Sequence, residues 1–279
     1  MLKVLKSGFF TSIQDLGRFG YRDMGVPVSG AMDTEAVKKA NQLLENALDA
    51  AALEITMTGP TLLFEAPTFI CLSGANISPT LNNEPVSQYQ VLKIGKGDIL
   101  SYGKMENGFR SYLAIKGGLE TPVVLGSRSQ YIPITQKKCL KDGDELRYEE
   151  TVAFEPALSG LKVENKFQQN ELEVFRGPEF SILSDSQLAT LFAQPFTVSE
   201  KNNRMAYQLA ELLPGHKYSM LTSGTLPGTV QFTPAGRLII LMKDGQTTGG
   251  YPRVLQLSEE AIGLLAQRKF GDSISFKLI

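Results

Sequence analysis

The sequence has 279 residues, with 28 Lys and Arg against 29 Asp and Glu, one histidine and no tryptophan. This length predicts about two domains, or one large barrel or sandwich, with enough buried surface to fold without a disulfide or metal. The net charge of −1 gives no electrostatic attraction to nucleic acid or to an anionic membrane, so we predict neither as a partner. The only histidine, His216, excludes metal motifs that need two histidines.

The cysteines and the N-terminus indicate a cellular compartment. Cys71 and Cys139 lie far apart, adjoin apolar residues and form no C-x-x-C motif, so we predict two free thiols in a reducing compartment. Residues Met1–Gly8 alternate apolar and polar side chains, which predicts a strand rather than a signal peptide. No stretch approaches the ~18 apolar residues of a membrane span. We therefore expect a soluble, cytoplasmic protein.

Strand patterns dominate the rest of the chain. Short runs of β-branched, aromatic and leucine residues, most of them bounded by Gly, Pro, Asn or Asp, predict strands at 61–64, 69–72, 111–115 and 238–242. The 26 glycines and 14 prolines supply turns. The fold class predicted from these patterns is mainly β with a few helices, as barrels or sandwiches.

Three segments have helical spacing instead. The first begins with Asp33 as the N-cap, and its apolar stripe runs to Leu48 at intervals of three and four residues. The second begins with the capping-box pattern Ser184–Gln187 and is ended by Pro195. The third begins at Ser258.

The chain divides into two predicted lobes. The most polar stretch, 149–171, is the expected linker, so we predict an N-terminal lobe of residues 1–160 and a C-terminal lobe of residues 161–279. Residues 114–118 resemble 241–245, and 142–146 resemble 270–274, at offsets of 127 and 128. A third Gly-Asp turn, at 97–98, fits no simple offset. The shared offset favours two lobes related by duplication.

Two dense polar segments lie near the N-terminus. In Gln14–Tyr21, Asp15 and Arg18 are three residues apart around a glycine, which predicts either a structural ion pair or a contact to an anion or metal. Gly25–Asp33 is a loop leading into a helix, where backbone N–H groups attract anions and Ser29 is a hydrogen-bond donor. The alternative is that this loop serves only to cap the helix.

Three more segments carry candidate site residues. Arg128 lies between two serines, just after a glycine. This pattern is typical of a binding site for a carboxylate or phosphate, or of a solvated turn. The stretch 243–252 is longer and more polar than a plain hairpin needs, which favours a function. The polar run around Arg204 predicts a position either in a cleft or in a surface loop. The sequence contains no P-loop and no G-x-G-x-x-G, so ATP would need another geometry or a partner's site.

Together these segments resemble the carboxyltransferase-like family that includes the 5-oxoprolinase C subunit, KipA and allophanate hydrolase subunit 2. The match runs in family order from about residue 8 to the C-terminus, through 14–18, 20–21, 25–33, 51–54, 59–62, 126–129, 177–178, 203–205 and 246–252. Departures are Ala206 where a glycine is expected, Asn76 where an aspartate is expected, and Gln231–Pro234 where the family usually has two adjacent prolines.

The resemblance implies two cyclophilin-like β-barrel lobes in a cytoplasmic complex with two partners, one KipI-like and one LamB/YcsF-like. That complex would open 5-oxo-L-proline to L-glutamate with ATP, and this chain would be inactive alone. Two alternatives stay open: a regulatory protein that binds a histidine-kinase inhibitor, as KipA-like relatives do, or an accessory component of a urea or allophanate amidase.

Residue chemistry, rather than the resemblance, assigns roles for such a reaction. A phosphorylated lactam needs cations around its phosphoryl oxygens, for which Arg18, Arg128 and Arg204 are candidates. We predict no resident metal; Mg²⁺ would arrive with ATP, held by Asp15 and Asp244, and the nucleotide would be bound with or by a partner. The predicted catalytic residues are Asp15, Arg18, Arg128 and Asp244, and the predicted substrate-binding residues are Ser29, Arg204, Gln246, Thr247 and Thr248.

Overall fold

The computed structural model describes residues 1–164 and 166–279. The chain is mainly β, with three α-helices in the described part, as the sequence predicts. It forms two compact units: Met1–Arg18 with Ser29–Asn165, and Phe19–Val28 with Lys166–Ile279. The short segment Phe19–Val28 therefore groups with the second unit, although it lies inside the sequence of the first.

The first unit contains two β-sheets that enclose one core. The six-stranded sheet has the order β11-β1-β4-β9-β6-β7, and the five-stranded sheet has the order β2-β3-β10-β5-β8. Side chains from both sheets, including Leu2, Phe64, Leu53 and Leu113, are fully buried between them. The strands are β1 (Leu2–Lys6), β2 (Phe10–Gln14), β3 (Ala52–Thr56), β4 (Thr61–Phe64), β5 (Thr68–Asn76), β6 (Pro79–Leu81), β7 (Glu84–Pro85), β8 (Val91–Ile94), β9 (Ile99–Tyr102), β10 (Asn107–Ile115) and β11 (Glu145–Leu146).

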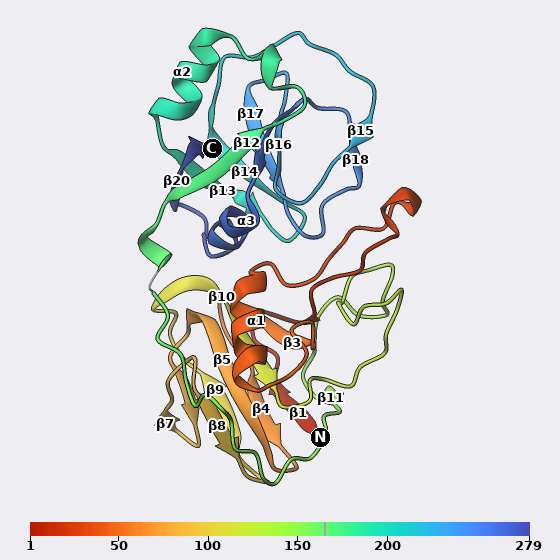
Figure 1. Ribbon diagram of the computed structural model, residues 1–279, viewed down its shortest axis with the longest axis vertical. Coiled ribbons are helices and arrows are strands. Elements are labelled where there is room, and N and C mark those ends of the chain that lie inside the picture. Colours follow the sequence, from red (N-terminus) through yellow and green to blue (C-terminus); the bar gives the residue numbers. More distant parts are fainter. Residues whose placement is uncertain (165) are drawn as a thin grey trace. The chain divides into compact units, whose positions relative to one another are not determined.

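Helix α1 (Thr34–Leu43) covers the outer face of the five-stranded sheet, over β3, β5 and β10 (Figure 1). Its N-cap is Asp33, whose carboxylate accepts the N–H of Ala36 as predicted. The helix ends earlier than its apolar stripe suggested, because Glu45 has a left-handed φ of 50° and Leu48 is exposed. The predicted extension to Leu48 is wrong.

The second unit is a closed barrel of seven strands in the order β12-β19-β16-β17-β14-β13-β20. Its strands are β12 (Glu171–Arg176), β13 (Phe196–Asn202), β14 (Ala206–Leu212), β16 (Thr229–Phe232), β17 (Arg237–Leu241), β19 (Arg253–Leu257) and β20 (Ser273–Leu278). A two-stranded ribbon of β15 (Ser223–Gly224) and β18 (Thr248–Gly249) lies outside this ring. The helices are α2 (Asp185–Ala193), with the predicted capping box at Ser184, and α3 (Glu259–Ala266), with Ser258 as N-cap; short 3-10 turns are η1 (Arg22–Met24), η2 (Lys166–Gln168) and η3 (Phe180–Ile182).

The Gly-Asp turns share one hydrogen-bond pattern in both units. The carboxylates of Asp144 and Asp272 each accept the backbone N–H three residues earlier, at 3.0 and 2.9 Å. Each turn also forms backbone hydrogen bonds with a valine in a strand, Val4 of β1 or Val198 of β13. Asp98 makes the same turn against Phe64. The pattern supports the predicted relation between residues 142–146 and 270–274, and the third copy shows that this turn also recurs within one unit.

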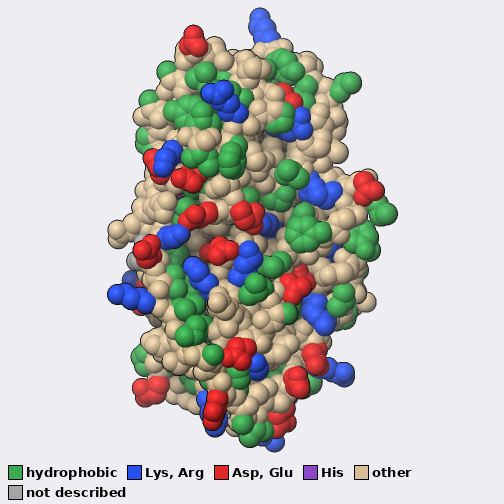
Figure 2. Space-filling view, in the orientation of Figure 1, with side chains coloured by type: hydrophobic (Ala, Val, Ile, Leu, Met, Phe, Trp, Pro, Cys, Tyr) green, Lys and Arg blue, Asp and Glu red, His purple; other side chains and the backbone are tan. Residues whose placement is uncertain are grey.

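The surface has no single sign of charge on the face seen in Figure 2, where Lys and Arg alternate with Asp and Glu. None of the helices in the described part of the chain is long and apolar enough to cross a membrane.

Candidate functional site

Asp15 organises the predicted site residues of the first unit. It follows strand β2, and its carboxylate accepts hydrogen bonds from Ser127 Oγ (2.7 Å), Ser129 Oγ (2.6 Å), the Arg128 N–H (2.6 Å) and the Gly17 N–H (2.8 Å). A carboxylate offers about four lone-pair positions. Asp15 therefore uses its accepting capacity to hold the 127–129 turn, which lies more than 110 residues away in the sequence.

Arg18 supports the same turn from inside the fold. Its guanidinium is almost fully buried, and Nη2 donates to the carbonyl oxygen of Ser129 at 2.5 Å. The sequence left open whether Asp15 and Arg18 form a direct pair. Instead, both hold the residues around Arg128.

Arg128 is held by its backbone and not by its side chain. Its N–H is bonded to Asp15, while its half-buried guanidinium makes no hydrogen bond or ion pair with any residue of 1–164 or 166–279. An arginine fork is built to bind a carboxylate or phosphate in two parallel hydrogen bonds. This arrangement leaves Arg128 free to bind an anion.

Ser29 lies on the loop next to Asp15. The Ala31 N–H donates to the Asp15 carbonyl oxygen at 2.8 Å, and both Ser29 and Gly30 have left-handed φ angles, of 56° and 84°. A Cβ at Gly30 would lie 2.7 Å from the Gly17 nitrogen, so only glycine fits there. The Ser29 hydroxyl is fully buried and has no hydrogen-bond partner in the described chain. A buried hydroxyl without a partner costs about 1–3 kcal/mol, which a ligand oxygen would offset.

Glu54 was not among the predicted site residues, yet it fixes this loop. Its fully buried carboxylate accepts the N–H of Met32 at 2.8 Å and the hydroxyl of Tyr112 at 2.9 Å. The Tyr112 hydroxyl in turn accepts the N–H of Asp33 at 2.8 Å. Burial first, and then the Glu54 charge, raise the pKa of Tyr112 well above its ordinary value. An acidic residue within an otherwise apolar strand was the signal available for finding Glu54.

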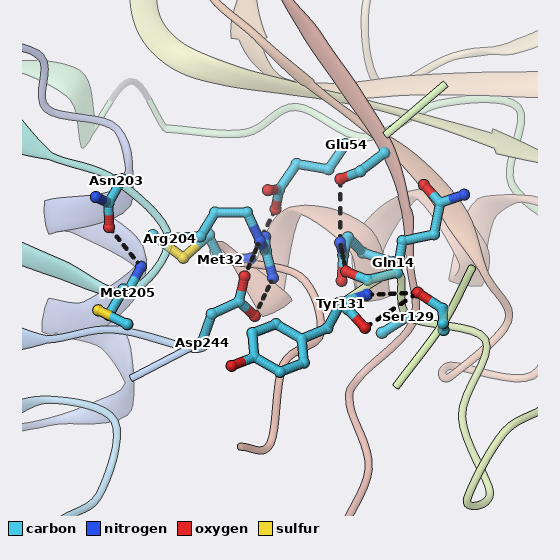
Figure 3. A network of polar contacts seen from close by, with 12 residues as sticks. Gln14, Met32, Glu54, Ser129, Tyr131, Asn203, Arg204, Met205 and Asp244 are labelled. Carbon is cyan, nitrogen blue, oxygen red and sulfur yellow. Dashed lines mark hydrogen bonds and ion pairs between the residues drawn. The ribbon is translucent and has the colours of Figure 1, made fainter. Parts of the chain in front are cut away.

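Arg204 and Asp244 form the core of a second cluster, in the second unit. The Arg204 guanidinium donates to the Asp244 carboxylate through Nε at 2.8 Å and Nη2 at 3.1 Å, and both side chains are largely buried (Figure 3). The Asp244 N–H also donates to the Arg204 carbonyl oxygen. Two residues 40 positions apart are thus joined by their backbones and by a bidentate ion pair.

Gln246, Thr247 and Thr248 lie on or beside the β15–β18 ribbon. Thr225 fastens this segment: its hydroxyl donates to the carbonyl oxygen of Gln246 (2.5 Å), and its backbone N–H donates to the carbonyl oxygen of Thr247 (3.0 Å). Gln246 and Thr248 are exposed and Thr247 is half-buried. Their assignment to substrate binding stays a prediction.

The carboxylates predicted to hold Mg²⁺ are already engaged. Asp15 binds the 127–129 turn and Asp244 binds Arg204, whereas Mg²⁺ demands an octahedral shell with one or two carboxylates alongside phosphates and waters. Within the described residues no three His, Cys, Asp or Glu side chains gather as a metal site. These residues do not fit a Mg²⁺ site built by this chain alone.

His216 is held by structural contacts at both ring nitrogens. Nδ1 accepts the N–H of Tyr218 and Nε2 bonds the Phe232 carbonyl oxygen, each at 3.1 Å, and the ring packs on Phe232. With both nitrogens engaged, this histidine is not placed as a general base, in agreement with the sequence interpretation.

Residues 24–278 match the carboxyltransferase domain family, subdomains A and B. The chain belongs to this family. It is 34% identical over 99% of its length to the 5-oxoprolinase C subunit of Escherichia coli (strain K12), covering 90% of that protein. It is also 30% identical, over 99% of its length, to urea amidolyase of Saccharomyces cerevisiae, of which it covers 16%.

Solved structures of similar proteins have the same fold. The chain superposes over 99% of its length on TTHA0988, with a TM-score of 0.87 and 28% identity, and on the urea amidolyase of K. lactis, with a TM-score of 0.87 and 30% identity. It spans only 55% of the TTHA0988 chain and 18% of the urea amidolyase chain. In both relatives, therefore, this domain pair is joined to further polypeptide.

Proposed function

We propose that this chain is the C subunit of an ATP-dependent 5-oxoprolinase, which opens 5-oxo-L-proline to L-glutamate, and that it is inactive alone. The observation that carries the proposal is the 34% identity along nearly the whole chain to a protein of that name. The unpaired Arg128 fork adds a chemical argument, because the substrate carries a carboxylate.

The reaction has to activate a stable amide. Transfer of the ATP γ-phosphoryl group to the lactam oxygen turns that oxygen into a leaving group, and water then attacks the ring carbon. Cleavage of the ring C–N bond, with protonation of the nitrogen, then leaves the acyl phosphate of glutamate. A second water hydrolyses this acyl phosphate, so one ATP and two waters give glutamate, ADP and phosphate. Such steps depend on positioning and on positive charge around developing anionic oxygens.

The residues of this chain supply binding and positioning in this scheme. The Arg128 fork binds the substrate carboxylate or the phosphoryl oxygens, and Ser29 Oγ donates to a substrate oxygen in the same cluster. Asp15, Arg18 and Glu54 are positioning residues, since their hydrogen bonds hold the 127–129 turn and the 29–33 loop.

The second cluster presents the predicted ribbon side chains. Asp244 fixes the orientation of Arg204 beside the turn that leads to Gln246, Thr247 and Thr248. These three side chains would contact the carboxylate or ring amide of the substrate.

Partner proteins supply what this chain lacks. The proposed partners are a KipI-like protein and a LamB/YcsF-like protein in a cytoplasmic complex. Both candidate carboxylates are engaged and His216 is structural, so we assign the Mg-ATP site and the general base to a partner or to a site shared with one. The longer TTHA0988 chain supports the idea that this domain pair works joined to another polypeptide.

A second candidate is an accessory role in urea carboxylation or amide hydrolysis. The 30% identity to urea amidolyase and the match to the K. lactis enzyme structure favour it. A purely regulatory, KipA-like role stays an alternative for which no specific contact in the described chain argues.

Reconstitution separates these functions. This chain and its two purified partners are incubated with 5-oxoproline and ATP, and glutamate is measured with and without this chain. The proposal predicts glutamate only when the chain is present. Equal glutamate in its absence would contradict the proposal, and bicarbonate-dependent turnover of urea instead would favour the second candidate.

A further inference from the structure

Gln231 is a polar residue on the outside of the barrel that is nevertheless covered. Along β16, Val230 and Phe232 point into the barrel core, and their cross-strand partners Ile240 and Leu238 are equally buried. Gln231 alternates with them and therefore faces outward. Its side chain is only 1% exposed, so something outside the ring lies over it.

The cover is the β15–β18 ribbon. A Cβ at Gly249 would overlap the amide nitrogen of Gln231 and would lie 2.8 Å from the amide nitrogen of Gln246. Gly249 is therefore in direct contact with Gln231, and a larger residue does not fit. The carboxamides of Gln231 and Gln246 therefore both approach Gly249. Gln231 is buried beneath it, and Gln246 is exposed beside it.

The buried amide nitrogen of Gln231 has no hydrogen-bond partner among the described residues. Its neighbours on the same face are satisfied: the Thr229 hydroxyl donates to Gln256 Oε1 at 2.9 Å, and Gln256 Nε2 donates to the Pro227 carbonyl oxygen at 2.8 Å. The lack of a partner is thus specific to Gln231. A buried donor left unbonded destabilises the folded protein, and it favours any ligand that brings an acceptor.

The ribbon that covers this amide is short. It consists of only two residue pairs, and one of its fastenings is the hydrogen bond from Arg253 Nη1 to the Gly224 carbonyl oxygen, at 2.5 Å. Arg253 is itself held by Glu179 through two side-chain hydrogen bonds, at 2.9 and 2.7 Å. Beyond its own two residue pairs, hydrogen bonds from Thr225 and Arg253 hold the ribbon in place.

We propose that Gln231 is a ligand-binding residue, whose amide N–H groups donate to a carbonyl or carboxylate oxygen of a small molecule when the Gly249 segment lifts. Gln246 Nε2, on the other side of Gly249, is the second donor. Resting on the proposed function, the ligand is 5-oxo-L-proline, which offers both a lactam carbonyl and a carboxylate. This subsite adds Gln231 to the predicted residues 246–248.

The test compares Gln231→Met with Gln256→Met, since Gln256 is a satisfied carboxamide on the same face. Calorimetric titration of 5-oxoproline into the full chain should give a dissociation constant about tenfold higher for Gln231→Met and within about threefold of wild type for Gln256→Met. The melting temperature of Gln231→Met should equal or exceed that of wild type, whereas Gln256→Met should melt lower. No binding by the wild-type chain, or unchanged binding by Gln231→Met, overturns the inference.

The reconstituted complex distinguishes this inference from the proposed function. If wild-type complex forms glutamate and Gln231→Met leaves KM for 5-oxoproline unchanged, the inference fails and the function stands. If no glutamate forms but the lactam still binds in a Gln231-dependent way, the function fails and the inference stands.

Discussion

Replacing Arg128 by alanine should remove an anion-binding fork and leave the fold intact. The guanidinium bonds to no described residue, while the backbone N–H that Asp15 holds is kept in the variant. The free energy of unfolding should therefore change by no more than about 0.5 kcal/mol, as for surface substitutions without partners.

The effect on catalysis should be much larger. A hydrogen bond to a charged group is worth about 1.5–3 kcal/mol, which corresponds to a loss of about 10- to 150-fold in kcat/KM. The assay is glutamate formation by the reconstituted complex at varied 5-oxoproline, with complex assembly checked by gel filtration. Arg128→Lys, which keeps the charge and loses the fork, should fall between alanine and wild type.

Arg147→Ala is a matched control, because Arg147 is an exposed arginine of the same unit. It should leave kcat/KM unchanged. If the Arg128→Ala complex assembles and its kcat/KM stays within about twofold of wild type, the assignment of Arg128 to ligand binding is refuted.

Three further substitutions test the contacts that hold the Asp15 cluster and the Glu179–Arg253 pair beside the β15–β18 ribbon. Asp15→Asn puts an amide donor opposite the Arg128 N–H, which is also a donor. The free energy of unfolding, measured by urea titration, should fall by about 2–4 kcal/mol, and an unchanged urea midpoint would contradict this. Gly30→Ala places a Cβ 2.7 Å from backbone atoms at a φ of 84°, so the free energy of unfolding should fall by at least about 2 kcal/mol, and a wild-type melting temperature would argue against this close approach of the two loops. Hydrogen bonds from Arg253 lower the pKa of Glu179, so the ionised Glu179 adds to the free energy of unfolding at neutral pH. This stabilisation is lost as the pH falls below the ordinary pKa of 4.5. Glu179→Gln should therefore flatten this part of the stability–pH curve, and a curve parallel to that of the wild type would refute this role of Glu179.

Local patterns in the sequence predicted the elements well. Asp33, Ser184 and Ser258 each cap the helix expected of them, and the run Thr61–Phe64 is a strand with those same ends. These are effects of neighbouring residues, which a sequence displays directly. The end of α1 was missed because it depends on the left-handed conformation of Glu45, which apolar spacing does not encode.

Contacts between distant segments were only partly predictable. Composition singled out the segments containing Asp15, Arg128, Arg204 and Asp244, but not that Asp15 would hold the turn of Arg128 or that Arg204 would pair with Asp244. Arg204 and Asp244 meet because they lie beside the paired strands β14 and β17, whereas the 127–129 turn that Asp15 holds belongs to no strand. Gln231 was noted only as a departure from the family pattern, since an unbonded amide becomes visible only once its neighbours are placed.

The proposed function requires this chain for ATP-dependent opening of 5-oxoproline. The most direct measurement is the rate of glutamate release by the purified complex, with the chain present, omitted, or replaced by Arg128→Ala. The proposed function predicts glutamate release with the wild-type chain, none without it, and a rate about tenfold or more lower with the variant at low substrate. Equal release in all three mixtures would contradict it.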